Sequence, residues 1–313
     1  MSEASLIAHI AAMAAVRPGV SVGIGDDAAV LDGDPAVVLA HDMVVQDVHF
    51  RLGTASPRDI GHKALAVNLS DVAAMGASPV AALVGLGVPR GAPAGLVEEV
   101  YAGMEELAAR WGCTIAGGDT TSAAELVLGV TVVGRMAPGV RPVLRSGARP
   151  GDVLWVTGPV GASAAGLRLL EDPSLGAADP ALVAAHVRPV PRVREGLAVA
   201  AAGAHAMLDC SDGLAIDASR LAAASGVRVV LELDRVPVAG GVAAVAAALG
   251  VAADVFAATG GEDYELIVAA PPGFAPGCAL LPVGRGEAGA GLAATRGGAP
   301  VALDRLGWDH DVG

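Results

Sequence analysis

Lysine is nearly absent from the sequence. The 313-residue chain has a single lysine, Lys63, against nineteen arginines. Lys63 lies in GHKALAV, which does not fit the GxxxxGK[ST] pattern, so a Walker-type phosphate loop is excluded. Cysteine is also scarce, and Cys113, Cys210 and Cys278 are far apart and form no CxxC pair. We therefore expect a cytoplasmic protein that holds neither disulfides nor structural zinc.

Basic residues are too few to balance the acidic ones. The chain has 33 Asp and Glu residues, a net charge of -13 and a pI of about 4.8. This balance argues against nucleic acid and anionic membranes as partners. Mean hydropathy is high, at +0.57, but alanine supplies much of it, and the apolar run 240–261 contains Asp254. We predict no transmembrane helix, and the N-terminus lacks the pattern of a signal peptide.

Helix and strand patterns alternate along both halves of the chain. Apolar spacing predicts a helix over 3–16. Several strand patterns follow one another directly, which favours a mixed α/β fold of the α+β type over a doubly wound sheet. The length suits two domains, and the basic, Pro- and Gly-rich segment 141–152 predicts a boundary between 1–148 and 149–313.

Some predicted elements carry acidic residues. We expect short strands at 37–40, 43–45 and 114–117, and a helix that starts at Ser56-Pro57 and stops at Gly76. Asp71 falls on the same face of that helix as its apolar residues. A buried aspartate must be paired or bind a cation, because burying the charge alone is prohibitive.

Six places combine an acidic residue with small residues where a strand pattern ends or a helix pattern begins. For any one of them, a helix cap or a tight turn is the commoner explanation. The conjunction changes the odds, because ordinary surface turns mix Asn, Ser, Lys and Asp, whereas these are acidic every time. The six are GIGDD (Asp26, Asp27), AHD (Asp42), NLSD (Asp71), GGDTT (Asp119), DCSD (Asp209, Asp212) and GGED (Glu262, Asp263).

Clustered carboxylates repel one another unless a cation lies among them. Oxygen ligands without nearby Cys or paired His select Mg²⁺, Mn²⁺ or Ca²⁺ rather than zinc, and Mg²⁺ is typically completed by substrate phosphates. The pattern therefore indicates a phosphoryl-transfer site for ATP. Gly117-Gly118 and Gly260-Gly261 would let backbone amides approach a phosphate, and Arg145 in LRSGARPGD is the best-placed side chain to bind one.

The other candidate residues have two readings each. His49-Phe50 is as well explained by a core pair as by a wall of the substrate site, and Trp308 by a tail anchor as by a stacking surface. Cys210 is better explained as a small buried residue than as a nucleophile, because neighbouring carboxylates would raise the pKa of its thiol.

Taken together, the motifs resemble a known family. GIGDDAAV, DVHF, KALAVNLSDVAAMGASP, GGDTTSA, LRSGARPGD, LDCSDGLAIDASRLA, GGEDYEL and GWDH occur in the order and spacing of thiamine-monophosphate kinase, of the aminoimidazole ribonucleotide synthetase superfamily. The resemblance implies two α/β domains, with an N-terminal mixed sheet that forms a homodimer and a C-terminal α/β sandwich. It implies ATP-dependent phosphorylation of thiamine monophosphate to thiamine diphosphate.

The resemblance also implies a role for individual residues. Several Mg²⁺ ions would be held by Asp27, Asp42, Asp71, Asp119, Asp209 and Asp212, with Asp26 shaping its turn. ATP would contact Gly118, Asp119, Arg145 and Ser211; the acceptor would contact His49, Glu262 and Trp308; and Asp42, Asp71, Asp209 and Arg145 would be catalytic. The chain departs from the family where Ala40 and His41 replace Ser or Thr, and where no aromatic residue follows His310 in the tail.

The expected mechanism is a direct in-line attack by a phosphate oxygen of the acceptor, without a phosphoenzyme. A phosphate monoester is already anionic near neutral pH, so positioning and charge neutralisation would suffice. The alternatives are a selenophosphate synthetase, a hydrogenase maturation factor of the same superfamily, or a module that binds metal or nucleotide without catalysis. The first two commonly use a Cys near one terminus, which this sequence lacks.

Overall fold

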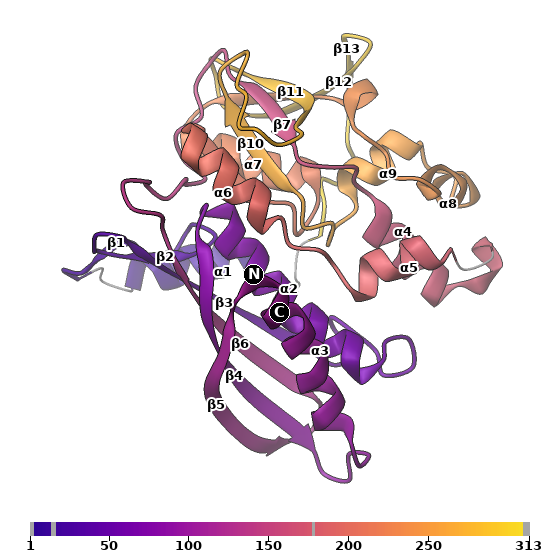
Figure 1. Cartoon of the computed structure of the whole chain (residues 1–313). Coiled ribbons are helices and arrows are strands. Elements are labelled where there is room, and N and C mark those ends of the chain that lie inside the picture. The colour runs from indigo at the N-terminus through magenta and orange to yellow at the C-terminus, as the bar shows by residue number, and fades with distance from the viewer. Residues whose placement is uncertain (1–2, 14–16, 177–178, 309–313) are drawn as a thin grey trace.

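The chain folds into two sheets with helices packed against them (Figure 1). The computed structural model describes residues 3–13, 17–176 and 179–308. The first sheet has the strand order β1-β2-β3-β6-β4-β5 and the second β13-β12-β9-β11-β7-β10-β8. Both combine antiparallel pairs with one parallel pair, β4 with β5 and β9 with β12. The mixed α/β architecture predicted from consecutive strands is confirmed.

The first sheet and the helices of the first half have these bounds: α1 Glu3–Met13, β1 Val20–Val22, β2 Ala29–Leu31, β3 Val37–Val45, α2 Pro57–Ala74, β4 Ser78–Pro89, α3 Leu96–Trp111, β5 Thr114–Ala123 and β6 Val127–Arg135. The second half begins with β7 Val153–Val156, α4 Ala162–Glu171, η1 Pro173–Leu175, α5 Pro180–Val187, α6 Val193–Ala202, β8 Ala206–Asp209 and α7 Leu214–Ser225. It ends with β9 Arg228–Glu232, η2 Leu233–Arg235, α8 Val242–Ala248, α9 Ala253–Thr259, β10 Leu266–Ala270, β11 Leu281–Glu287, β12 Gly291–Arg296 and β13 Ala299–Val301.

Three predicted strand runs were too short, and they belong to two strands. The runs at 37–40 and 43–45 form one strand, β3, which pairs with β6 along its whole length, so Asp42 lies inside a strand. The predicted strand at 114–117 extends through GGDTTSA as β5, so Asp119 also lies within a strand rather than in a turn. The continuous ladders to β6 and β4 satisfy the backbone groups of these segments, and this gain overrides the weak β propensity of Gly and Asp.

Helix α2 is the central element of the molecule. Its start was predicted correctly: Ser56 is the N-cap, and it forms a capping box with Asp59. The helix is buried on nearly all sides, because it packs on β3, β6 and α3 and, in the second half, on α6 and β8. Gly61 permits the close approach of α3, since a Cβ there would lie 1.8 Å from the Val100 carbonyl oxygen.

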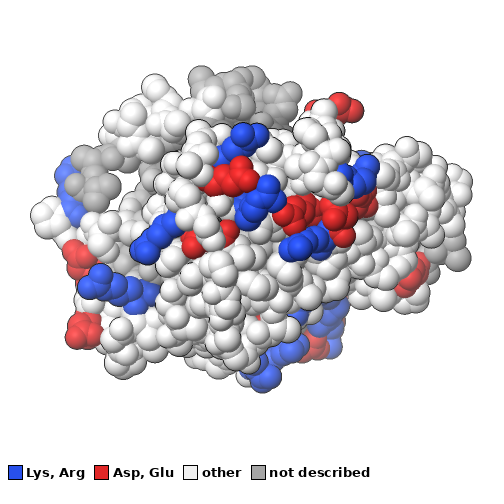
Figure 2. Space-filling model, turned by 90° about the horizontal axis from the view of Figure 1, so that it is seen from above, with Lys and Arg blue, Asp and Glu red and all other residues white. Residues whose placement is uncertain are grey.

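Charged side chains are mixed on the surface. On the face in Figure 2, basic and acidic residues lie next to one another, without a continuous basic area. Within the described residues no single helix has the length and apolar content to cross a membrane. Helices α8 and α9 meet that requirement only as a pair bent by 102°.

Candidate functional site

Three of the predicted acidic residues meet at the boundary between the two halves. Asp27 lies between β1 and β2, Asp71 in the last turn of α2 and Asp209 at the end of β8. Each offers a carboxylate oxygen, and these oxygens all lie within 4.8 Å of one another. The cluster lines a cleft of about 1650 Å³ that residues of both halves form. Ser70, next to Asp71, donates a hydrogen bond of 2.6 Å to Asp209 and so ties α2 to β8.

The carboxyl groups of Asp71 and Asp209 resist ionisation. Burial raises the pKa of both Asp71 and Asp209 well above the usual range, and neighbouring carboxylates raise it further. Burial also raises the pKa of Asp42, whose carboxyl group lies against that of Asp71. A cation among these oxygens would favour the ionised forms, so the cluster has the electrostatics of a metal site.

The donor set fits a hard divalent cation. Asp27 is buried, and its Oδ1 accepts a hydrogen bond of 2.6 Å from the Arg145 guanidinium. Among the residues that the structure describes, its Oδ2 has no hydrogen-bond partner. A buried carboxylate oxygen without a partner is costly, and a bound cation would satisfy it. Asp26 instead accepts hydrogen bonds from the backbone N–H groups of Asp27 and Arg145, as expected of a residue that shapes the turn.

A second arginine, Arg220, also faces the acidic residues of the cleft. It lies on α7 and pairs with Asp212 and, at 2.7 Å, with Asp217. No sequence motif singled out Arg220, although it follows Asp217 at helical spacing, i to i+3, in DCSDGLAIDASR. Arg145 and Arg220 supply part of the positive charge that these carboxylates need.

The motifs DCSD, GGED and GWDH are joined through their backbones. The N–H of Glu262 donates to the carbonyl of Ser211 at 2.6 Å, and the N–H of Trp308 to that of Asp212 at 2.9 Å. Ser211, Glu262 and Trp308 therefore line the same cleft as the acidic cluster. Trp308 is 49% exposed, and its ring lies 5.5 Å from the guanidinium of Arg305.

The backbone of Glu262 lies in a strained loop. Its φ is 64°, in the left-handed region that residues other than glycine rarely adopt. Burial opposes its charge, but Lys63 and His186 outweigh that effect and lower its pKa to about 2. Glu262 is thus the one acidic residue of GGED that stays ionised across the physiological range, whereas burial raises the pKa of Asp263 to about 7.

Gly118 and Asp119 are the two predicted site residues that the chain does not bring to this cleft. The register places Asp42, Val130, Val84 and Gly118 side by side across four strands. With adjacent strands about 4.8 Å apart, Gly118 lies roughly 14 Å from Asp42. Within one chain, Asp119 is therefore too far away to share an ion with the cluster.

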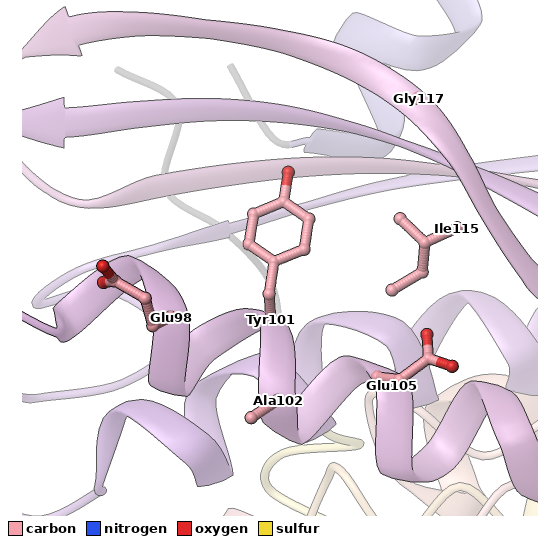
Figure 3. A pocket seen from close by; sticks show the side chains of 6 residues that line it. All are labelled: Glu98, Tyr101, Ala102, Glu105, Ile115 and Gly117. Carbon is pink, nitrogen blue, oxygen red and sulfur yellow. The ribbon is translucent and has the colours of Figure 1, made fainter.

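Gly117, two residues before Asp119, borders a second hollow. This pocket, of about 550 Å³, lies between α3 and the start of β5, and Gly117 lines it. Figure 3 shows Tyr101 projecting from α3 toward the strands, with Glu98 and Glu105 on either side of it along the helix. Asp119 is exposed and does not line this pocket.

Two histidines and one cysteine complete the set of residues that the sequence singled out. His49 lines the cleft, and its Nδ1 accepts a hydrogen bond of 3.1 Å from the Val45 N–H, while Phe50 is buried in the core. His41 is exposed and its Nδ1 lies 2.9 Å from the Thr131 hydroxyl. Cys210 is fully buried, and burial followed by nearby carboxylates raises the pKa of its thiol well above the usual value, as predicted.

Comparison with known proteins gives one family match in each half of the chain. Residues 25–136 match the family described as AIR synthase related protein, N-terminal domain, and residues 149–277 match its C-terminal domain. The thiamine-monophosphate kinase of Mycobacterium tuberculosis is 43% identical over 254 residues, which cover 79% of this chain and 74% of that protein. The structure of AaThiL complexed with AMPPCP and TMP is 31% identical with a TM-score of 0.88, covering 99% of this chain and 97% of that one. The hydrogenase maturation protein HypE in complex with ATP has a TM-score of 0.72 over 90% of this chain and 88% of its own, but at 23% identity it shares the fold alone.

The two matched domains and the acidic cleft between them define the class, that of AIR synthase related proteins. Within that class, the identity to curated relatives over most of its length settles the narrower question. The chain belongs to the thiamine-monophosphate kinase family.

Proposed function

We propose that this chain transfers the γ-phosphoryl group of ATP to the phosphate of thiamine monophosphate, giving thiamine diphosphate and ADP. The observation that carries the proposal is the convergence of Asp27, Asp71 and Asp209 beside Arg145 in one cleft, in a chain of this kinase family. The relative AaThiL was solved with AMPPCP, an analogue of ATP, and with TMP. That pair of ligands supports a cleft that holds a nucleotide and an acceptor together.

The metal of this reaction is Mg²⁺ in our proposal, and several ions are bound. The carboxylates of Asp27, Asp42, Asp71, Asp209 and Asp212 would hold them, because all five line the cleft and offer oxygen atoms alone. When bound, Mg²⁺ neutralises negative charge on the phosphates during transfer. The orphan Oδ2 of Asp27 supports this assignment.

The residues of the chain position the two substrates. Arg145 donates to carboxylate oxygen in the cleft and has the planar guanidinium that binds phosphate oxygens, so with Ser211 it faces ATP. His49, Glu262 and Trp308 face the acceptor. An acceptor phosphate that is already anionic needs no strong general base, so alignment and charge neutralisation supply the catalysis, and no phosphoenzyme forms.

The other functions fit the residues less well. The alternative enzymes commonly use a reactive cysteine. Cys210 adjoins the cleft, but it is fully buried and the pKa of its thiol is raised, so it is poorly suited to that role. A module that binds metal or nucleotide without catalysis would not need a second substrate site, where Glu262 is held ionised. The three free cysteines also support the cytoplasm as the location that we propose.

A coupled assay of ADP release tests the proposed function. We expect ADP to form only when ATP, Mg²⁺ and thiamine monophosphate are all present, with one thiamine diphosphate formed for each ADP. ATP labelled at the γ position should leave no label on the protein. ADP release that is independent of thiamine monophosphate, or that follows another phosphate acceptor, would contradict the assignment.

We also propose that the protein is a homodimer formed through the first sheet. Helices α2 and α3 cover one face of this sheet (Figure 1). The other face carries exposed apolar side chains, since Met43 is 53%, Val80 38% and Leu83 48% exposed. Pairing of this face with a second copy would bury them, and it would bring the exposed Asp119 of one copy toward the cleft of the other.

A further inference from the structure

The single lysine of the chain is buried at the boundary of the two halves. Lys63 lies in the second turn of α2, and its side chain is 3% exposed. Its ammonium group donates a hydrogen bond of 3.2 Å to the backbone carbonyl of His49 and lies 2.7 Å from a carboxylate oxygen of Glu262. The lysine thus connects two residues that we place at the acceptor end of the cleft, one from each half of the chain.

The second oxygen of Glu262 is held from another side. It lies 3.2 Å from Nδ1 of His186 on α5, and the same nitrogen lies 3.2 Å from the hydroxyl of Ser163 on α4. His186 and Ser163 are buried, whereas the Glu262 side chain remains 26% exposed. Both oxygens of the carboxylate are therefore fixed by the protein, and the part left accessible faces the cleft.

The energetics of this arrangement suit a role in positioning Glu262 better than a role in stabilising the fold. A buried ion pair gains little over well-packed apolar side chains, because both charges must lose their hydration. The loop of Glu262 adds backbone strain, and such strain persists only where the surrounding structure imposes it. A compact ammonium with several donors can bind two acceptors from two segments at one point, which the planar fork of arginine does less readily.

We infer that Lys63 is a positioning residue for the acceptor substrate, acting through Glu262 and the His49 segment. Lys63 fixes the distance between the two halves of the acceptor end, so that Glu262 presents its carboxylate in one orientation. The inference rests on the proposed function, since the acceptor is thiamine monophosphate. ATP and Mg²⁺ are bound by other residues of the cleft, so Lys63 acts on the acceptor and not on the nucleotide.

Steady-state kinetics of Lys63→Met test the role. We expect the KM for thiamine monophosphate to rise by about 10- to 100-fold, because Glu262 keeps His186 as a partner but loses the charged group that fixes its other oxygen. The KM for ATP should stay within about 2-fold of the wild-type value, since uniform binding of the nucleotide is untouched. The control is Arg58→Met on the same helix, which removes exposed ion pairs with Glu99 and Glu106 and should leave both KM values unchanged.

A double-mutant cycle with Glu262→Gln separates positioning from a general loss of structure. If Lys63 acts through Glu262, Lys63→Met should change the KM for thiamine monophosphate much less in the Glu262→Gln background. Because the chain has one lysine, protein made with isotope-labelled lysine gives a single side-chain NMR signal. That signal should shift in Glu262→Gln, and in the wild type when thiamine monophosphate is added without ATP.

The outcomes distinguish the inference from the proposed function. A wild-type enzyme that turns over thiamine monophosphate, together with Lys63→Met of unchanged KM for it, would overturn the role of Lys63 and leave the function intact. Additive effects in the cycle, or a lysine signal that neither change moves, would also overturn it. A wild-type protein that forms no ADP with thiamine monophosphate would remove the proposed function and the inference with it.

Discussion

At the scale of residues, the site is a balance between carboxylates and the cations that face them. Asp27 and Asp212 are paired with Arg145 and Arg220. Burial still raises the pKa of Asp27, and it raises the pKa of Asp71 and Asp209 well above the usual range, so the cluster lacks sufficient positive charge. A bound divalent cation would relieve this deficit. Removing one carboxylate should therefore affect metal binding more than folding.

Asp209→Asn should separate turnover from stability. We expect turnover to fall by about 100-fold or more, because the cluster loses a ligand. The melting temperature without metal should stay level or rise, since a buried carboxyl group that faces other carboxyl groups is replaced by a neutral amide, and its increase on adding Mg²⁺ should shrink. Calorimetry with and without Mg²⁺, together with the ADP assay, measures both effects.

The matched control for this change is Asp152→Asn. Asp152 is also buried, but it pairs with His205 and the Arg149 N–H and does not line the cleft. Asp152→Asn should lower the melting temperature and leave turnover near the wild-type value. Full turnover in Asp209→Asn would rule out a metal role for Asp209.

At the scale of elements, one helix organises most of the site. Along α2, Lys63 binds Glu262, Asn68 accepts a hydrogen bond of 3.0 Å from the Asp42 N–H, and Ser70 donates to Asp209. Asp71 comes one residue later, in the cluster itself. The polar residues of α2 thus orient acidic residues that three other segments supply, while its apolar residues pack against both halves of the molecule.

Loss of the α2 cap should cost stability without changing the chemistry. Ser56→Ala removes the hydroxyl that accepts a hydrogen bond from the Asp59 N–H and donates one to the Asp59 carboxylate, and we expect a loss of about 1 kcal/mol in the free energy of unfolding. Urea unfolding measures the loss, and turnover at 25 °C should remain close to the wild-type value. Ser56→Thr keeps the capping oxygen and should recover most of the stability; an equal loss in both variants would show that the cap does not contribute.

The element scale also shows why sequence patterns succeeded for α2 and failed for two strands. Ser56, Pro57 and Gly76 act within a few residues, so the start and stop of α2 follow from local chemistry. The length of β3 depends on its pairing with β6, and the length of β5 on its pairing with β4. Both partner strands lie far away in sequence. Local propensity carries no information about such a ladder.

At the scale of the whole molecule, the exposed Asp119 and the uncovered face of the first sheet both predict a homodimer. If Asp119 completes the cleft of a second copy, Asp119→Asn and Asp209→Asn should each be inactive alone. Mixed and refolded in equal amounts, random pairing would make half of the dimers hybrids with one intact site, so about a quarter of the wild-type activity should return. Size-exclusion chromatography of the mixture checks the dimer.

Two outcomes would contradict the role of Asp119 in a second copy. A monomeric protein, or dimers that recover no activity on mixing, would show that Asp119 does not act across an interface. Because mixing two copies of the same variant cannot rebuild an intact site, each variant refolded by itself is the control for the experiment.

The sequence by itself determined the family of this protein and predicted the metal that its reaction uses. Repeated acidic motifs, a single lysine outside any phosphate loop and the order of the motifs indicated a magnesium-dependent kinase of one family, because the type and spacing of residues are local properties. Only the tertiary structure decided that Asp27, Asp71 and Asp209 meet, that Asp119 lies elsewhere on an exposed strand, and that Arg220, His186 and Lys63 face the carboxylates. These facts depend on how α2 packs between two sheets. Packing of distant segments is set by the burial of apolar surface over the whole chain, which no short motif contains.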